Sequence, residues 1–166
     1  IFSKMGINIQ AVLEDVVHHV PAPQGDPKAP FKALIFDSQY DAYRGVVVYF
    51  RVMEGTLTLD QTVRMMASGA ENGLVEIGHL LPTKLEPCKS LSAGEVGYLT
   101  ASIKNVKDTQ VGDTITTVET PAAEPLPGYR PARSMVYCGI YTEDGSKYSD
   151  LRDALEKLQL NDAALS

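Results

Sequence analysis

Cys88 and Cys138 are the residues of this chain best suited to act as nucleophiles or as soft metal ligands. They are its only cysteines, and neither lies in a CxxC pair or in a metal-binding spacing with histidine. A cysteine nucleophile needs an activating base, and a structural zinc site needs a grouped set of Cys and His ligands. We therefore interpret both as reduced core thiols, with a disulfide or a metal site as the alternative.

The three histidines could supply general bases or metal ligands, but their positions favour structural roles. His18 and His19 end a predicted helix, where positive charge suits the helix dipole. We interpret them as capping or surface residues, with a metal site as the alternative. His79 follows Gly78 inside a predicted strand, and we interpret it as a satisfied barrel histidine rather than a catalytic one.

The sequence lacks the motifs expected for catalysis by paired carboxylates and for nucleotide hydrolysis. The glutamates of the central region are scattered rather than paired, and a general acid or base needs a partner and a pocket; they are Glu76, Glu86 and Glu95. The chain contains neither a GxxxxGK[ST] phosphate loop nor a GxSxG nucleophile elbow. We therefore predict no catalytic residue, no metal site and no cofactor in this chain, and we interpret it as a binding and coupling module.

Composition limits the possible partners. The 166 residues are 44% hydrophobic with a formal net charge of −6. No apolar run approaches the eighteen or so residues of a membrane span, and the net charge argues against a free-standing nucleic-acid binder while allowing a local basic face. The chain begins without Met or a targeting segment and stops just after a helical pattern, so we expect both ends to be cut from something larger.

The stretch 40–60 is the element around which the chain is predicted to be organised. Between Gly45 and Gly55, alternate residues fall on two faces of a long strand. One face is fully apolar and carries Val46, Val48, Phe50 and Val52. The other is amphipathic and carries Val47, Tyr49, Arg51 and Met53. From Phe31 to about Val118, short strands recur with glycine-bearing turns, which predicts an all-β barrel or sandwich.

Helical and proline-rich segments flank this β region. Residues 7–20 predict a helix with Asn8 as N-cap and a face of Ile9, Val12, Leu13, Val16, Val17 and Val20. Residues 21–30 hold four prolines and predict a domain linker, with a polyproline ligand as the alternative. Residues 121–132 predict a second hinge. After it, SMVYCGIY (134–141) predicts a strand, and residues 145–160 predict a helix with Leu151, Ala154, Leu155 and Leu158 on one face.

Four segments of the sequence support a family resemblance. They are DSQYDAYRGVVVYFRVMEGTL, LSAGEVGYLTASIKNVKDTQVGDTIT, LPGYRPARSMVYCGIY and LRDALEKLQLNDAAL. Together they closely resemble LepA, a family of ribosome-associated translational GTPases, over nearly the whole chain. The segments YRGVVVYFRV and EKLQLNDAAL are most similar to the cyanobacterial and plastid branch of the family. This similarity implies that the protein is located in the plastid stroma or, alternatively, in the bacterial cytoplasm.

The resemblance implies a mainly β fold built from parts of three domains. Residues 1–20 would be the end of the GTPase domain, 21–30 a linker, 31–120 the second, β-barrel domain, 121–132 a hinge, and 133–166 the βα start of a ferredoxin-like third domain.

The resemblance also assigns a remnant of a guanine-contacting loop. The family usually reads Ser-Ala-Lys, one residue and Gly, where this chain has residues 2–6, FSKMG. Ser3 and Lys4 are therefore the implied nucleotide-contacting residues, although Phe2 replaces the usual serine. The full-length parent would use GTP and Mg, whereas the fragment would hold no cofactor. A second departure is Leu59-Asp60-Gln61 where relatives carry Lys-Gly-Asp, so a tight turn must be made without that glycine.

In this family the barrel docks on small-subunit ribosomal RNA, which needs positive groups at one end of the barrel. The implied contact residues are Tyr43 and Arg44 first, then Arg51, Lys104 and Lys107. The resemblance further implies tRNA as a possible partner of the full-length protein. We expect a monomer, with domain swapping possible in the fragment. The alternative is a stand-alone barrel that binds a small ligand or peptide in its own pocket, unrelated to ribosomes.

Overall fold

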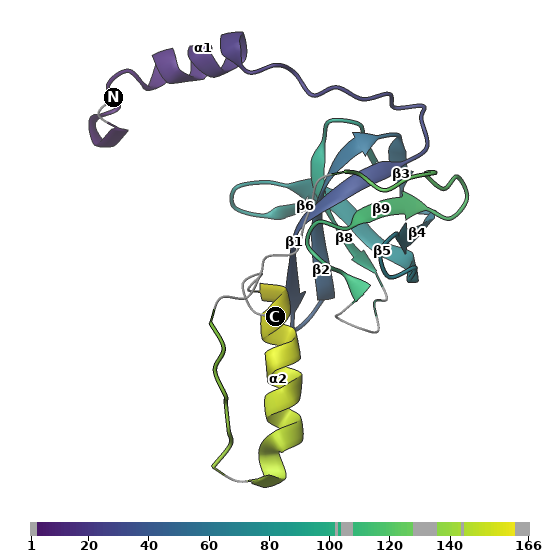
Figure 1. The fold of residues 1–166 in the computed structure, drawn as a ribbon. Coiled ribbons are helices and arrows are strands. Elements are labelled where there is room, and N and C mark those ends of the chain that lie inside the picture. Colours follow the sequence, from purple (N-terminus) through teal and green to yellow (C-terminus); the bar gives the residue numbers. More distant parts are fainter. Residues whose placement is uncertain (1–2, 102, 104–107, 128–135, 144, 162–166) are drawn as a thin grey trace.

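The computed structural model describes residues 3–101, 103, 108–127, 136–143 and 145–161 (Figure 1). The predicted mainly β fold with a helix near each end is confirmed. In chain order the elements are η1 (Ser3–Met5), α1 (Ile9–His19), β1 (Lys32–Asp41), β2 (Gly45–Glu54), β3 (Thr56–Thr58), β4 (Thr62–Met65), β5 (Glu71–Leu80), β6 (Leu85–Pro87), β7 (Ser90–Ser92), β8 (Val96–Ala101), β9 (Thr114–Thr117), η3 (Gly145–Lys147) and α2 (Tyr148–Asn161).

The strands form a closed antiparallel barrel. They are hydrogen-bonded in the order β4-β9-β1-β2-β8-β5, and β4 also pairs with β5, which closes the circle. β6 extends β5 as a short hairpin, and β3 and β7 form a separate two-stranded sheet. Sequence periodicity found the longer strands but not the three-residue strands β3, β6 and β7, which are too short to show an alternation.

The organising strand β2 supplies one wall of the core. Its predicted apolar face is confirmed, because Val46, Val48, Phe50 and Val52 are all buried. The ring of Phe50 meets that of Phe31 edge to face, with centroids 6.4 Å apart. The rest of the core comes from the other strands and their turns, namely Ala33, Ile35, Leu57, Val63, Met65, Ile77, Leu91, Leu99, Ala101 and Ile115.

The turn after β3 shows how the missing glycine is replaced. Leu59 and Asp60 do not adopt positive φ. The Gln61 amide instead donates to the Thr58 carbonyl over 3.2 Å, and the Gln61 side-chain oxygen accepts from the Thr58 amide over 2.9 Å. A glutamine side chain therefore completes a turn that needs no left-handed residue.

The proline-rich segment before β1 is docked on the barrel. We call residues 23–29 the N-terminal strap. The Gly55 amide donates to the Asp26 carbonyl over 2.9 Å, and the Thr56 hydroxyl donates to the Pro27 carbonyl over 3.1 Å. A Cβ at Gly25 would lie 2.3 Å from the Met53 carbonyl oxygen, so the strap lies in backbone contact with β2.

The segment after β9 is also attached in its described part, residues 120–127, which we call the C-terminal strap. The Ala122 amide donates to the Thr116 hydroxyl over 2.8 Å, and the Leu126 amide donates to the Thr114 hydroxyl over 2.9 Å. Residues 128–132 of the predicted hinge lie outside the described residues. The part that is described is held by β9.

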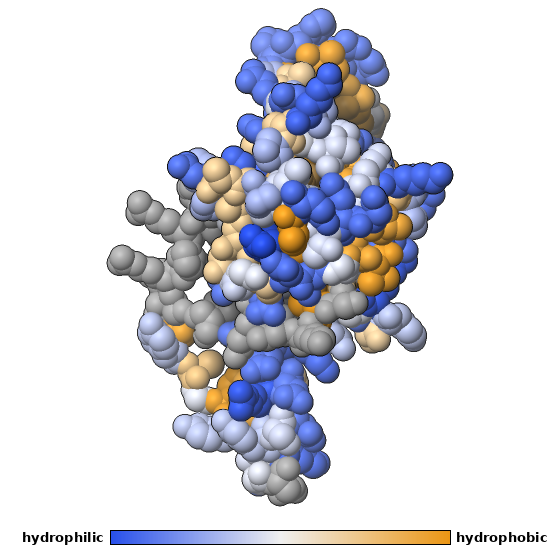
Figure 2. All heavy atoms as spheres, turned by 90° about the vertical axis from the view of Figure 1, so that its right-hand side faces the viewer, coloured by the Kyte–Doolittle hydropathy of each residue, from blue (hydrophilic) through white to orange (hydrophobic). Residues whose placement is uncertain are grey.

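The helix α1 extends away from the barrel at the end of an extended segment (Figure 1). The helix is confirmed, but its apolar face is exposed and none of its residues is buried. In Figure 2 this part of the molecule, at the top, shows orange surface beside blue. Asn8 is the N-cap residue, as predicted, but it adopts a left-handed conformation (φ 62°) and its side chain makes no capping hydrogen bond.

The C-terminal part contains a helix without the strand predicted to precede it. Residues 136–141 form no strand, and the predicted strand is therefore wrong over that range, since a strand needs a pairing partner and no described strand lies beside it. For the same reason the prediction that Cys138 is a core thiol is wrong, because this cysteine is exposed. The helix α2 lies against β1, and the ammonium group of Lys157 lies 5.0 Å from the ring centroid of Tyr40.

Among the described residues, no helix is long and apolar enough to cross a membrane.

Candidate nucleic-acid interface

The β1–β2 hairpin ends in a loop whose backbone is fixed by one carboxylate. Oδ1 of Asp41 accepts hydrogen bonds from the amides of Tyr43 (2.7 Å) and Arg44 (2.9 Å). These bonds, that from Arg44 first, hold the pKa of the Asp41 carboxyl below its ordinary value. Gly45 follows with φ 76° and faces Asp41 across the hairpin. We call residues 41–45 the hairpin tip.

The hairpin tip displays the two leading candidates side by side in sequence. The side chain of Tyr43 is fully exposed, at 99% of its maximum. Arg44 is half-exposed, and its guanidinium Nη1 lies 3.8 Å from Oε1 of Glu76 on β5. A half-exposed ion pair of this length adds little to stability, and in the structure it places the guanidinium of Arg44 beside β5.

Glu76 is in turn held by the barrel core. Its Oε1 accepts a hydrogen bond of 2.6 Å from the hydroxyl of Tyr98, whose side chain is buried. Burial, followed by this bond to a carboxylate, raises the pKa of the Tyr98 hydroxyl. Glu76 therefore has two side-chain partners, Tyr98 and Arg44. It connects the core to the hairpin tip through Arg44.

Of the remaining candidates the structure describes only Arg51, which lies apart from the tip. Arg51 is seven residues further along β2, which places it about 23 Å from Arg44 along an extended strand, and it pairs in register with Leu34 and Val96. Lys104 and Lys107 lie outside the described residues. The tip is also not a basic patch, because its described neighbours include the carboxylates of Asp41 and Glu76.

The residues that sequence reasoning missed are those that hold the tip: Asp41, Glu76 and Tyr98. Asp41 had a local signal, since an Asp followed by a hairpin turn commonly accepts backbone hydrogen bonds two and three residues on. Glu76 and Tyr98 had none, because they meet Arg44 only through the pairing of β5 with β8 and of β8 with β2.

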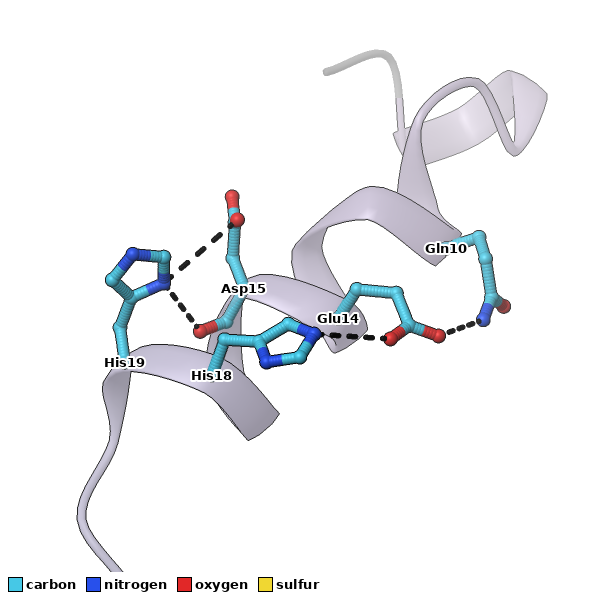
Figure 3. Close-up of polar contacts among 5 residues, drawn as sticks. All are labelled: Gln10, Glu14, Asp15, His18 and His19. Atoms are coloured by element: carbon cyan, nitrogen blue, oxygen red, sulfur yellow. Dashed lines mark hydrogen bonds and ion pairs between the residues drawn. The ribbon is translucent and has the colours of Figure 1, made fainter.

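The N-terminal candidates form no described site. Lys4 is exposed within η1, and only the backbone of Ser3 is described. Figure 3 shows the polar contacts of α1: Gln10 donates to Glu14 over 3.0 Å, while His18 and His19 lie 3.9 Å from the carboxylates of Glu14 and Asp15. Both histidines are exposed, as predicted for surface residues. No group of three or more possible metal ligands occurs within the described ranges.

His79 and Cys88, for which structural roles were predicted, lie on the wall of the barrel. His79 is half-buried, with Nε2 3.9 Å from Glu95, which fits a structural histidine. Cys88 is a free thiol packed partly against the core. Its Sγ donates to the Ser90 carbonyl over 3.2 Å, and burial raises the pKa of its thiol, so it is not an activated nucleophile.

Comparison with known families identifies the class of barrel. The family described as elongation factor Tu domain 2 matches residues 45–116, from the start of β2 into β9. This is a translation-factor β-barrel, and the closed circle of strands agrees with that class.

Longer relatives identify the type of factor. Elongation factor 4 of Acetivibrio thermocellus is 64% identical over 166 residues, all of this chain and 28% of that protein. Elongation factor 4 of Bacillus subtilis is 60% identical over 163 residues, 98% of this chain and 26% of that protein. The resemblance to LepA, elongation factor 4, is thereby confirmed over the whole chain, which spans about a quarter of the length of these relatives. Both relatives are bacterial, and the plastid type stays a prediction.

Proposed function

We propose that this chain is the middle segment of a LepA-type elongation factor, whose barrel docks on the RNA of the small ribosomal subunit through the hairpin tip. The observation that carries this proposal is the pairing of a fully exposed Tyr43 with Arg44 on a backbone fixed by Asp41. A rigid tip can contact RNA without ordering a loop first, which lowers the entropy lost on binding.

The proposed role extends to the parts that flank the barrel. Residues 1–20 would end a GTPase domain, with Ser3 and Lys4 in the remnant of its guanine-contacting loop, and residues 133–166 would begin a ferredoxin-like domain. The full-length parent would bind and hydrolyse GTP with Mg on the ribosome, in the bacterial cytoplasm or the plastid stroma, and would act on elongation and tRNA position. This segment would turn over no GTP, because it contains no phosphate loop.

Coupling between these domains would pass through the straps. The N-terminal strap is hydrogen-bonded to Gly55 and Thr56, and the C-terminal strap is bonded to Thr114 and Thr116. A displacement of the barrel on docking would therefore be transmitted to both neighbours through ordered backbone. We propose that the segment does this as a monomer.

The alternative function, a barrel with its own ligand pocket, is not favoured by the interior. Large buried side chains fill it; they include Phe31, Ile35, Phe50, Leu57, Met65, Ile77, Leu91, Leu99 and Ile115. A ligand cavity needs an apolar space with a few convergent polar groups. These residues occupy the space that such a cavity would need.

Sedimentation with purified small ribosomal subunits over a salt series tests the docking proposal. Arg44→Glu should weaken binding by at least about tenfold, since it replaces a phosphate contact with repulsion. Lys84→Glu is the matched control, because it makes the same kind of charge change at an exposed residue outside the hairpin tip and should change binding by less than about twofold.

Equal losses in the two variants would refute docking through the tip and indicate a general charge effect. Absence of salt-dependent binding by the unchanged chain would refute docking by this segment altogether. Measurable GTP hydrolysis by the purified chain would contradict its proposed non-catalytic role.

A further inference from the structure

Tyr43 differs from the other tyrosines of the barrel because its side chain makes no contact with the described residues that would explain its position. Tyr98 is buried and hydrogen-bonded to Glu76, and Tyr49 is half-buried and donates to Gln39 over 3.3 Å. Tyr43 is 99% exposed. A large aromatic ring held wholly in water contributes nothing to the barrel core, and exposed aromatic side chains are enriched where a partner covers them.

The ring is also displayed on a fixed support. The amide of Tyr43 itself donates to Asp41 over 2.7 Å, and that of Arg44 over 2.9 Å. The backbone is thus held on both sides of the Tyr43 side chain. Only the two side-chain torsions of Tyr43 remain free, so little conformational entropy is lost when a flat partner covers the ring.

The neighbouring charge defines what kind of flat partner fits. Arg44 adjoins Tyr43 in sequence, and its guanidinium lies 3.8 Å from Glu76, so an aromatic ring and a cation are presented by neighbouring residues. The chain carries a formal net charge of −6, and Asp41 and Glu76 lie beside this cation. Phosphate neutralisation alone therefore supplies little affinity here, and a contact that does not depend on charge must supply the rest.

We infer that Tyr43 stacks on an unpaired RNA base while Arg44 contacts the phosphate next to it, so that the hairpin tip recognises a loop or bulge rather than a continuous duplex. This inference rests on the proposed docking function and specifies the class of RNA that it requires. Bases in a duplex are already stacked and have no free face, whereas unpaired bases stack on aromatic side chains in a sequence-tolerant way.

Substitutions of Tyr43 test this inference by binding to purified small ribosomal subunits. Tyr43→Ala and Tyr43→Leu should each weaken binding about tenfold, and Tyr43→Phe should retain it within about twofold, because the stack needs the ring and not the hydroxyl. The slope of affinity against salt should be unchanged in all three. Arg44→Gln should instead reduce that slope by about one phosphate contact.

Tyr43→Trp provides a second measurement of stacking. The chain has no tryptophan, so the introduced indole would be the only tryptophan fluorophore in this chain. Its fluorescence should be quenched when small subunits are added, because a nucleobase covers the ring. Thermal unfolding of each variant should match that of the unchanged chain, since the side chain at position 43 touches no core residue.

The outcomes separate the inference from the docking proposal. If the unchanged chain binds and Tyr43→Ala binds equally well, stacking is refuted while docking stands. Stacking is also refuted if the indole fluorescence of Tyr43→Trp does not change on binding. It is refuted as well if Tyr43→Phe loses as much affinity as Tyr43→Ala, since that result would indicate a hydrogen bond from the hydroxyl. If the unchanged chain does not bind at all, both are refuted.

Discussion

The two straps that flank the barrel are both rich in proline, yet they are held by different chemistry. The N-terminal strap depends on the absence of side chains, because Gly25 lies against Met53 and Gly55 lies against Phe31 and Ala29. The C-terminal strap depends on the presence of hydroxyl groups, since Thr114 and Thr116 accept its amides. Proline density alone predicts a linker at the first place and a hinge at the second. The residues opposite each strap determine how its described part is held.

This difference predicts opposite responses to conservative substitution. A close backbone contact at a glycine should be disrupted by substitution with alanine, which adds only a methyl group, and no other side chain at that position should restore the contact. A hydrogen bond to a threonine hydroxyl should be lost when valine replaces the threonine, and serine at that position should restore it. Four substitutions test the contrast.

Gly55→Ala should have the largest effect. Gly55 has φ 78°, and a Cβ there would lie 2.5 Å from the Cα of Phe31 and 2.7 Å from the carbonyl oxygen of Ala29. Left-handed strain and overpacking together should lower the free energy of unfolding by about 3 kcal/mol. Urea denaturation measures this. Gly69→Ala is the matched control, because Gly69 has a similar φ of 72° but nothing within 4 Å of its Cβ position, so a similar loss in the control would assign the whole effect to backbone strain.

Thr116→Val should have the second largest effect on the free energy of unfolding. The buried hydroxyl of Thr116 donates to the Phe31 carbonyl over 2.9 Å and accepts from the Ala122 amide. Valine leaves both groups without that partner and should lower the free energy of unfolding by about 2 kcal/mol. Thr116→Ser keeps the hydroxyl and should recover most of the loss. If serine is as damaging as valine, packing of the methyl group rather than hydrogen bonding holds the C-terminal strap.

Gly25→Ala should release the N-terminal strap with a smaller effect on the barrel, of about 1 kcal/mol. Limited trypsin digestion measures the release directly. Cleavage after Lys28 should become faster, because its amide is held by Asp26 over 2.9 Å in the docked strap. Cleavage after the exposed Lys4 is the internal control and should not change. An unchanged rate at Lys28 would show that the strap tolerates the methyl group.

Thr114→Val should have the smallest effect, since one hydrogen bond is lost, from the partly buried amide of Leu126. We expect about 1 kcal/mol in the free energy of unfolding and faster amide hydrogen exchange at Leu126. Thr114→Ser should restore protection. Exchange that is equally slow in the valine variant would mean that this end of the C-terminal strap is held by other contacts.

Sequence reasoning predicted the barrel well because its signal is local. The period-two pattern of Val46, Val48, Phe50 and Val52 requires one buried face, whatever the strand pairs with. The positions of the longer strands followed from such patterns and from the turns between them. The domain boundaries inferred from the resemblance stay predictions.

The parts that failed depend on contacts between distant residues. Residues 136–141 have strand character, but a strand forms only beside a partner, and pattern cannot supply one. Cys138 has an apolar sequence context and is exposed for the same reason. At the hairpin tip, Tyr43 and Arg44 could be proposed from the family resemblance. The contacts of Arg44 with Glu76 and of Glu76 with Tyr98 could not be proposed, because they depend on strand pairing between residues 32 and 54 positions beyond Arg44.

The position of β9 in the barrel has a consequence for the time course of synthesis. β9 pairs with both β1 and β4, and Ala33 pairs with Ile115, 82 residues later in the chain. At a translation rate of about 5 to 20 residues per second, β1 waits about 4 to 16 seconds for this partner. During that interval the nascent barrel has an open edge on β1 and, once residues 62–65 have been made, a second one on β4; open edges are templates for wrong pairing. Arrival of the last strand removes both edges in one step.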